Sequence, residues 1–281
     1  DIADVQRLLG AAAGKPRVAV IGGGLLGLEA ANGLAGQGVD VTVIHDAAWL
    51  LNRQLDVEAA GLLRSALEAK GIAFKVSAMS ASIESDPDTG RLKGVHFKDG
   101  SFLACDLVVM AVGIRPNVAL ARAMGLQVDK AILVNDTLQT FDPRIYAVGE
   151  CVQHRGALFG LVAPLYEQAK VCANHLAGMG IGRFVQKPTA TTLKVSGVEL
   201  FSAGDFNHAE ADILVFRDPA RGIYKKLCLH EGRLVGAVLY GDAREGPWYF
   251  DLIRAGSDVS AWRDQLMFGK VVEGVDNAIA A

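Results

Sequence analysis

The chain has 281 residues, of which 51% are hydrophobic, and a formal net charge of −3. This length suffices for one large or two ordinary domains with a buried core, and the composition excludes a disordered chain. The 28 basic and 31 acidic residues form no basic stripe, so we expect no nucleic-acid partner. The apolar stretch 18–36 includes three adjacent glycines and Glu29, which argues against a membrane span. Four unclustered cysteines indicate a reducing compartment, and we therefore expect a cytoplasmic protein.

The predicted elements of residues 15–112 follow the order of a mononucleotide-binding unit. β-branched runs predict buried strands, and amphipathic spacing predicts the helices between them. Strands are expected at 17–21, 39–44, 72–75 and 107–110, helices at 25–37 and 56–70, and an inserted antiparallel meander at 77–84, 92–97 and 102–104. The chain is thus predicted to be an α/β protein with a Rossmann-like nucleotide-binding domain, preceded by a short connecting helix within residues 1–14.

The remaining residues predict two further parts and a tail. Residues 113–182 have short strands at 131–134 and 145–148 and a helix at 164–177, which are too few to close a sheet. Residues 183–268 predict a C-terminal α+β domain, and residues 269–281 a weakly patterned tail. In this domain we expect strands at 191–195, 200–203, 213–216, 224–229 and 234–240, and helices at 245–255 and 260–268.

The strongest chemical signal is the spacing Gly22-x-Gly24-x-x-Gly27 between the first strand and the first helix of this domain. Gly22 permits a tight turn, Gly24 lets the backbone approach a pyrophosphate, and Gly27 allows close packing of helix and strand. The helix that begins at Leu25 offers free N–H groups and a positive dipole end to phosphates. In this context the motif predicts dinucleotide binding.

The end of the second strand leaves the choice between NADH and NADPH open. NAD-binding proteins place Asp or Glu there to accept a hydrogen bond from the ribose 2′-hydroxyl. This chain has His45 followed by Asp46, and Arg53 a few residues later. Asp46 favours NADH slightly, whereas Arg53 could approach a 2′-phosphate.

Two further motifs resemble those of the pyridine nucleotide–disulfide oxidoreductases, which use NAD(P)H and FAD. They are AVGIRPN at 111–117 and TFDPRIYAVGE at 140–150. The resemblance implies that the first motif closes over the nicotinamide cofactor and that the second carries an acidic residue for the FAD ribityl chain. It also implies that residues 113–182 are the C-terminal part of an FAD-binding domain whose N-terminal part is missing, and that the helix after LVAP (161–164) points its N-terminus at the isoalloxazine. The residues that it assigns to cofactor binding are Glu29, Val112, Gly113, Gly149, Glu150, Val162 and Ala163, with Glu150 replacing the usual Asp.

Longer stretches resemble the large subunits of assimilatory NAD(P)H nitrite reductases. They include LKVSGVELFSAGDF at 193–206 and GAVLYGDAREGPWYFDLIRAGSDVSAWRDQLMFG at 236–269. This resemblance implies that electrons pass from NAD(P)H through FAD to iron–sulfur and siroheme centres, which reduce nitrite to ammonia. The implied partners are an N-terminal FAD domain and downstream iron–sulfur and siroheme domains of the same polypeptide, and a small subunit.

Some parts of that system are expected to lie outside this chain. Only residues 1–14 precede the nucleotide-binding domain, and the cysteines show neither the CxxxxC disulfide motif nor metal-site spacing. We therefore expect a fragment that binds NAD(P)H weakly, does not retain FAD, holds no metal and is inactive alone. Hydride transfer needs no acid–base pair, and no catalytic side chain is assigned. A stand-alone ferredoxin- or rubredoxin-type reductase, a purely nucleotide-binding or docking module, and a homodimer remain alternatives.

Overall fold

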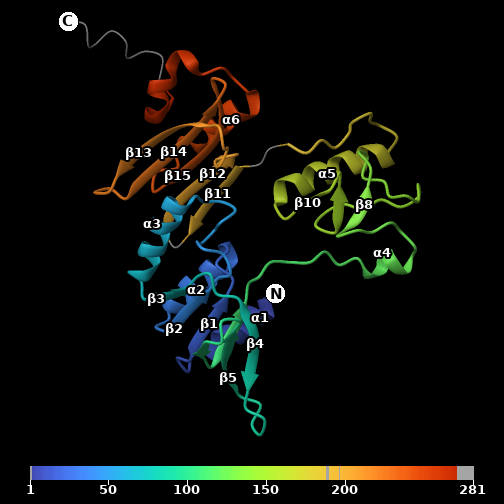
Figure 1. Cartoon of the computed structure of the whole chain (residues 1–281). Coiled ribbons are helices and arrows are strands. Elements are labelled where there is room, and N and C mark those ends of the chain that lie inside the picture. The colour runs from blue at the N-terminus through green and yellow to red at the C-terminus, as the bar shows by residue number, and fades with distance from the viewer. Residues whose placement is uncertain (1, 188–189, 196, 271–281) are drawn as a thin grey trace, which may run out of the picture. The chain divides into compact units, whose positions relative to one another are not determined.

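The computed structural model describes residues 2–187, 190–195 and 197–270. The chain divides into two units, the first formed by residues 1–112 and 188–281 and the second by residues 113–187. Figure 1 shows their elements in chain order. Among the described residues, no helix combines the length and apolarity that crossing a bilayer requires.

A four-stranded parallel sheet is the centre of the nucleotide-binding part of the first unit. Its order is β3-β2-β1-β7, with β1 at Arg17–Ile21, β2 at Asp40–Ile44, β3 at Ile72–Lys75 and β7 at Leu107–Met110. Val18 and Val20 on one face of β1 and Ala19 and Ile21 on its other face are all buried, as expected for a strand that is covered on both faces. The predicted Rossmann-like α/β fold is thereby confirmed.

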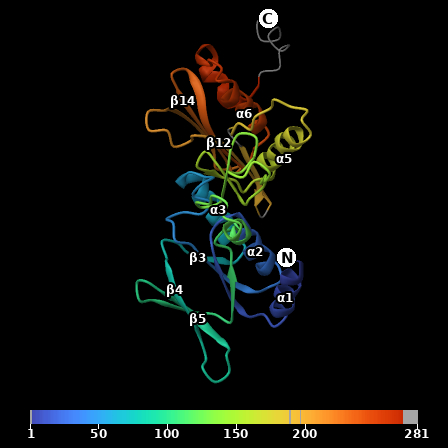
Figure 2. The ribbon, with the colours of Figure 1, turned by 90° about the vertical axis from the view of Figure 1, so that its right-hand side faces the viewer.

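Three helices accompany this sheet, and a meander extends from it. The helices are α1 at Ile2–Ala12, α2 at Leu25–Ala35 and α3 at Val57–Glu68. Asp56 is the N-cap of α3, where its Oδ1 accepts a 3.0 Å hydrogen bond from the Ala59 N–H. The strands β4 (Ser80–Ser85), β5 (Leu92–Phe97) and β6 (Phe102–Ala104) form the antiparallel meander, whose β4 and β5 lie on the side away from α3 (Figure 2).

The C-terminal part of the first unit is a five-stranded antiparallel sheet of order β11-β12-β15-β14-β13. Helix α6 (Gly246–Ala255) packs on β12 and β15, and Tyr249 is fully buried there. The strands are β11 at Ala190–Val195, β12 at Val198–Gly204, β13 at Asp212–Asp218, β14 at Ile223–His230 and β15 at Arg233–Tyr240. Other side chains of this sheet, including Tyr224 and Val238, belong to the same buried cluster as Leu50 and Leu55 of the nucleotide-binding part. The two parts of the first unit therefore share one core.

The second unit is small and has three short strands and two helices among its described residues. The strands are β8 at Ile132–Val134, β9 at Val152–His154 and β10 at Ala157–Leu158, and the helices are α4 at Ala119–Ala123 and α5 at Val162–Leu176. The prediction of a strand at 145–148 was wrong, because Tyr146 forms only an isolated bridge with Gln139 and β9 pairs with β8 instead.

The helix expected at 260–268 is present as a 3₁₀ helix over Ser260–Phe268, with non-helical dihedral angles at Trp262. The short helix α4 has no strong sequence signal, since it contains only five residues. Most of the expected tail lies outside the described residues.

Candidate functional site

The glycine-rich turn between β1 and α2 has the geometry that its spacing predicts. Gly22 has a φ of +122°, and a Cβ there would lie 2.2 Å from the Ala111 carbonyl oxygen. A Cβ on Gly27 would lie 1.9 Å from the Gly22 carbonyl oxygen, so only glycine lets α2 pack this closely on the turn. At Gly24, by contrast, a Cβ would meet no atom within 4 Å. The turn is therefore closed on its protein side and open at Gly24.

The start of α2 is an anion-binding feature. Gly24 is the N-cap residue, and no side chain in the described part of the chain caps the helix. The first turn, which begins at Leu25, holds no acidic residue, and Glu29 lies exposed further along the helix. Unpaired N–H groups and the positive end of the helix dipole thus face the open space at Gly24, which suits a pyrophosphate.

The end of β2 lies against the same turn. The His45 side chain is only 11% exposed, and its Nδ1 accepts a 3.2 Å hydrogen bond from the Gly23 N–H. Its other ring nitrogen, Nε2, is buried and has no partner among the described residues. Asp46 is 70% exposed, and Arg53 is exposed in the loop that follows. His45 is therefore oriented toward the turn, while Asp46 and Arg53 remain accessible to a ligand.

The residues after β7 complete this edge of the first unit. Ala111 donates its N–H to the Ile21 carbonyl and touches Gly22, and Val112 after it is exposed. Gly113, with a φ of +90°, begins the second unit. The motif at 111–117 thus starts beside the glycine-rich turn.

In the second unit, a buried amide joins the two segments that were expected to face a flavin. Gly149 has a φ of +101°, and its N–H donates a 2.9 Å hydrogen bond to Oε1 of Gln168 on α5. Gln168 is fully buried, and its Nε2 has no partner among the described residues. Sequence reasoning missed Gln168; a glutamine on the inner face of a predicted helix is the signal that could have indicated it.

The surroundings of that contact are open. Glu150 is exposed, and no described side chain caps α5, which begins at Val162, so the N–H groups of Val162 and Ala163 have no capping partner among the described residues. The exposed carboxylate, the helix N-terminus and the unpaired Gln168 amide are chemically suited to a polar chain and an anionic ring. The residues present therefore fit part of an FAD site.

An ion-pair network joins the end of strand β9 to the residues that follow β8. Asp136 accepts hydrogen bonds from Arg155 at 2.8 and 3.0 Å and lies 2.9 Å from Nε2 of the buried His154. The Arg155 guanidinium, followed by His154, lowers the pKa of Asp136 to about 2. The network holds β9 against the chain that follows β8.

The cysteines form no redox or metal centre among the described residues. All four are free thiols, and burial raises the pKa of Cys105, Cys172 and Cys228, which keeps them uncharged. The described part of the chain also contains no cluster of three or more His, Cys, Asp or Glu that could hold a metal ion.

Comparison with known proteins identifies the family. The sequence model described as "Pyridine nucleotide-disulphide oxidoreductase" matches residues 2–175. The chain belongs to the pyridine nucleotide-disulphide oxidoreductase family. A second model, "Rubredoxin NAD+ reductase C-terminal domain", matches residues 189–257, which include the five-stranded sheet.

Individual relatives are more specific than the family model. The chain is 51% identical to "Nitrite reductase [NAD(P)H]" of Bacillus subtilis over 92% of its own length and 32% of the relative's. It is 42% identical to the "Assimilatory nitrate reductase electron transfer subunit" of the same species, over 95% of this chain and 34% of the relative. A solved NAD-dependent persulfide reductase from A. fulgidus superposes with a TM-score of 0.78 at 26% identity, over 97% of this chain and 54% of that one. The chain thus spans about a third of the length of these curated relatives.

Proposed function

We propose that this chain is the NAD(P)H-oxidising portion of a nitrite reductase. In the proposed reaction, electrons pass from NAD(P)H through FAD to downstream iron–sulfur and siroheme centres, where nitrite is reduced to ammonia. The observation that carries the proposal is the glycine-rich turn, closed at Gly22 and Gly27 but open at Gly24 in front of an uncapped helix. The 51% identity to a protein named as an NAD(P)H nitrite reductase supports the choice of substrate.

The residues of the first unit would bind and orient the nicotinamide cofactor. The N–H groups at the start of α2 hold the pyrophosphate, and Asp46 accepts a hydrogen bond from the adenosine ribose. His45 supports the turn from behind through the Gly23 N–H. Hydride transfer requires positioning and the exclusion of water rather than a general base. Arg53 is exposed near Asp46, so both NADH and NADPH remain candidate substrates.

The second unit would contribute only part of the FAD site. Bound FAD would supply the capacity to take up two electrons as a hydride and to release them one at a time. Glu150 and the N-terminus of α5 would contact the cofactor, and Gln168 would hold the Gly149 loop in place. Exposed apolar side chains such as Leu161, Val162 and Tyr166 at this helix start support the proposal that a further segment covers them. We therefore propose that this chain alone does not retain FAD and is inactive by itself.

The proposed partners follow from the same reasoning. They are the N-terminal FAD domain and the downstream iron–sulfur and siroheme domains of one polypeptide, together with a small subunit. A homodimer through the C-terminal sheet is a further proposal. The four free thiols suit the reducing cytoplasm, which is the location we propose.

A stand-alone NADH-dependent ferredoxin- or rubredoxin-type reductase is the second candidate. The match of residues 189–257 to the C-terminal domain of rubredoxin reductases favours it. Both candidates predict the same dinucleotide site and differ in the electron acceptor, and the complete reading frame around this chain would distinguish them by the presence or absence of downstream cysteine clusters.

The test of the proposal is a fluorescence titration of the purified chain with NADH and with NADPH, with an absorption spectrum taken beforehand. We expect saturable binding of one nucleotide per chain and no flavin absorption. If the chain binds neither nucleotide, the proposal of a dinucleotide site is refuted. Stoichiometric bound flavin would contradict the proposal that the chain holds only part of an FAD site.

A further inference from the structure

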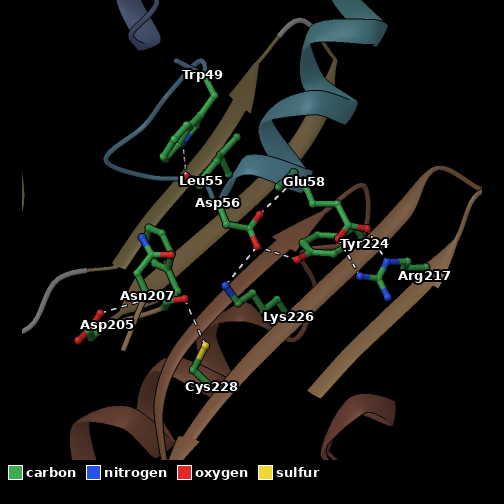
Figure 3. Close-up of polar contacts among 12 residues, drawn as sticks. Trp49, Leu55, Asp56, Glu58, Asp205, Asn207, Arg217, Tyr224, Lys226 and Cys228 are labelled. Atoms are coloured by element: carbon green, nitrogen blue, oxygen red, sulfur yellow. Dashed lines mark hydrogen bonds and ion pairs between the residues drawn. The ribbon is translucent and has the colours of Figure 1, made fainter. Parts of the chain in front are cut away.

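A buried carboxylate joins the nucleotide-binding part of the first unit to the C-terminal sheet. Asp56, which is 7% exposed, caps α3 through its Oδ1. Its Oδ2 accepts a 2.7 Å hydrogen bond from the Tyr224 hydroxyl, and Lys226 Nζ lies 3.4 Å from the same oxygen. Figure 3 shows Tyr224 and Lys226 reaching Asp56 from one strand of the C-terminal sheet, β14. The Asp56 side chain thus caps helix α3 and also binds strand β14 of the C-terminal sheet.

The surrounding contacts reinforce this junction. Arg217 on β13 donates two hydrogen bonds to Glu58, one of them at 2.8 Å, and its guanidinium lies 5.9 Å from the centre of the Tyr224 ring (Figure 3). Burial and the neighbouring Asp56 carboxylate raise the pKa of Tyr224, so its hydroxyl keeps its proton and donates it. The contact is therefore a charge-assisted hydrogen bond in a desolvated place, where such bonds are strong.

The segment that ends at Asp56 touches the glycine-rich turn at its other end. The Leu51 N–H donates a 3.0 Å hydrogen bond to the Gly23 carbonyl, and a Cβ on Gly23 would lie 2.9 Å from the Leu50 side chain. Trp49 Nε1 donates a 3.1 Å hydrogen bond to the Leu55 carbonyl, so the two ends of this segment are also bonded to each other. Residues 46–56, called the ribose loop below, are thus packed against the turn at one end and bound to β14 at the other.

From this geometry we infer that Tyr224 and Lys226 are positioning residues for the dinucleotide site, because they hold the ribose loop and through it the Gly23 backbone. The inference rests on the proposed function, since it assumes that the dinucleotide binds at the turn. The loop carries both Asp46 and Arg53, so its position controls the side chains that face the adenosine ribose. The C-terminal sheet is then part of the support of the nicotinamide cofactor site.

Coupling of this kind is reciprocal. If β14 holds the ribose loop in its binding conformation, a nucleotide that selects this conformation also strengthens the contact between Asp56 and Tyr224. We therefore expect NADH to slow amide exchange in β14 as well as in the loop. A residue that only stabilises the fold would not alter the affinity of the folded protein.

The test compares two tyrosine variants on neighbouring strands. Tyr224→Phe removes the hydroxyl that Asp56 accepts. Tyr240→Phe is the matched control, because Tyr240 is also buried and lies directly opposite Tyr224 on β15, yet among the described residues it makes no hydrogen bond to Asp56. The Kd for NADH is measured by fluorescence titration well below each unfolding midpoint, and amide exchange is followed by mass spectrometry.

Tyr224→Phe is expected to raise the Kd for NADH about fivefold or more and to speed amide exchange in the ribose loop. Tyr240→Phe is expected to leave the Kd within about twofold, because it keeps the buried ring and, among the described residues, the hydroxyl that it removes makes no hydrogen bond to Asp56. If Tyr224→Phe does not fold, Lys226→Gln serves in its place and is expected to change the Kd in the same direction.

The outcomes distinguish a failure of the positioning role of Tyr224 and Lys226 from a failure of the proposed function. If the wild-type chain binds NADH, and Tyr224→Phe and Lys226→Gln have the same Kd and the same amide exchange in the loop as the wild type, the inference is overturned. The proposed function then still stands. Equal losses in Tyr224→Phe and Tyr240→Phe overturn it as well, because the effect is then general. A wild-type chain that binds neither NADH nor NADPH overturns the proposed function and the inference together.

Discussion

Placing a carboxylate at Gly24 tests whether a pyrophosphate lies at the start of α2. Gly24 has φ −84° and ψ 179°, an extended conformation that any residue adopts, and a Cβ there meets no atom within 4 Å. Aspartate is also a preferred N-cap residue. Gly24→Asp should therefore leave the free energy of unfolding unchanged or raise it by about a few tenths of a kcal/mol.

The same change should abolish nucleotide binding. One unit charge about 4 Å from another costs about 4 kcal/mol at an effective dielectric constant of about 20. Since about 1.4 kcal/mol corresponds to a tenfold change, the Kd for NADH should rise by more than about a hundredfold. The new carboxylate would also compete with the phosphates for the N–H groups of α2.

Titration with NADH, together with thermal unfolding, gives both quantities on the same protein. Gly24→Asn is the matched control, because asparagine has the shape and capping ability of aspartate without its charge. We expect the asparagine variant to lose less affinity than the aspartate variant. A Gly24→Asp protein that unfolds like the wild type and binds NADH with the wild-type Kd would refute the assignment of the pyrophosphate to this turn.

Three further predictions concern the supports of the site. Gly27→Ala should lower the free energy of unfolding by about 2–3 kcal/mol, measured by denaturant titration, because its Cβ would lie 1.9 Å from the Gly22 carbonyl oxygen. Gln168→Leu should speed exchange of the Gly149 amide and cost about 1–3 kcal/mol, since that N–H loses its buried acceptor. The pKa of Asp136 is lowered from 3.8 to about 2, so its pairing stabilises the second unit fully above about pH 4 and is lost as the pH falls through 2. An Asp136→Asn protein that kept the full acid transition of the wild type would contradict this.

The nucleotide-binding part could be predicted from the sequence because its signals are local. The run 17–21, the glycine spacing and the Asp56 cap each depend on a few adjacent residues, and the structure has all three in place. The role of Gly27 also follows from the spacing, since its close contact with the Gly22 carbonyl lies within one strand–turn–helix unit, whereas Gly22 is close to Ala111, which follows the distant strand β7.

The remaining features depend on residues that are distant in sequence. His45 occupies the position of a ribose-binding carboxylate, but its ring is directed at Gly23, which only the three-dimensional packing shows. The hydrogen bond between Tyr224 and Asp56 spans 168 residues and leaves no periodic signal. Residues 145–148 have high β-propensity, which is why a strand was expected there. Among the described residues they form only one isolated bridge, between Tyr146 and Gln139, so the strand does not form.

Mapping the NADH footprint by amide exchange or chemical-shift changes tests the central claim most directly. The account predicts that the largest changes occur at residues 22–29 and 45–56, with smaller changes in β14 at residues 223–230. Saturable NADH binding whose footprint leaves the turn at 22–24 unchanged would contradict it.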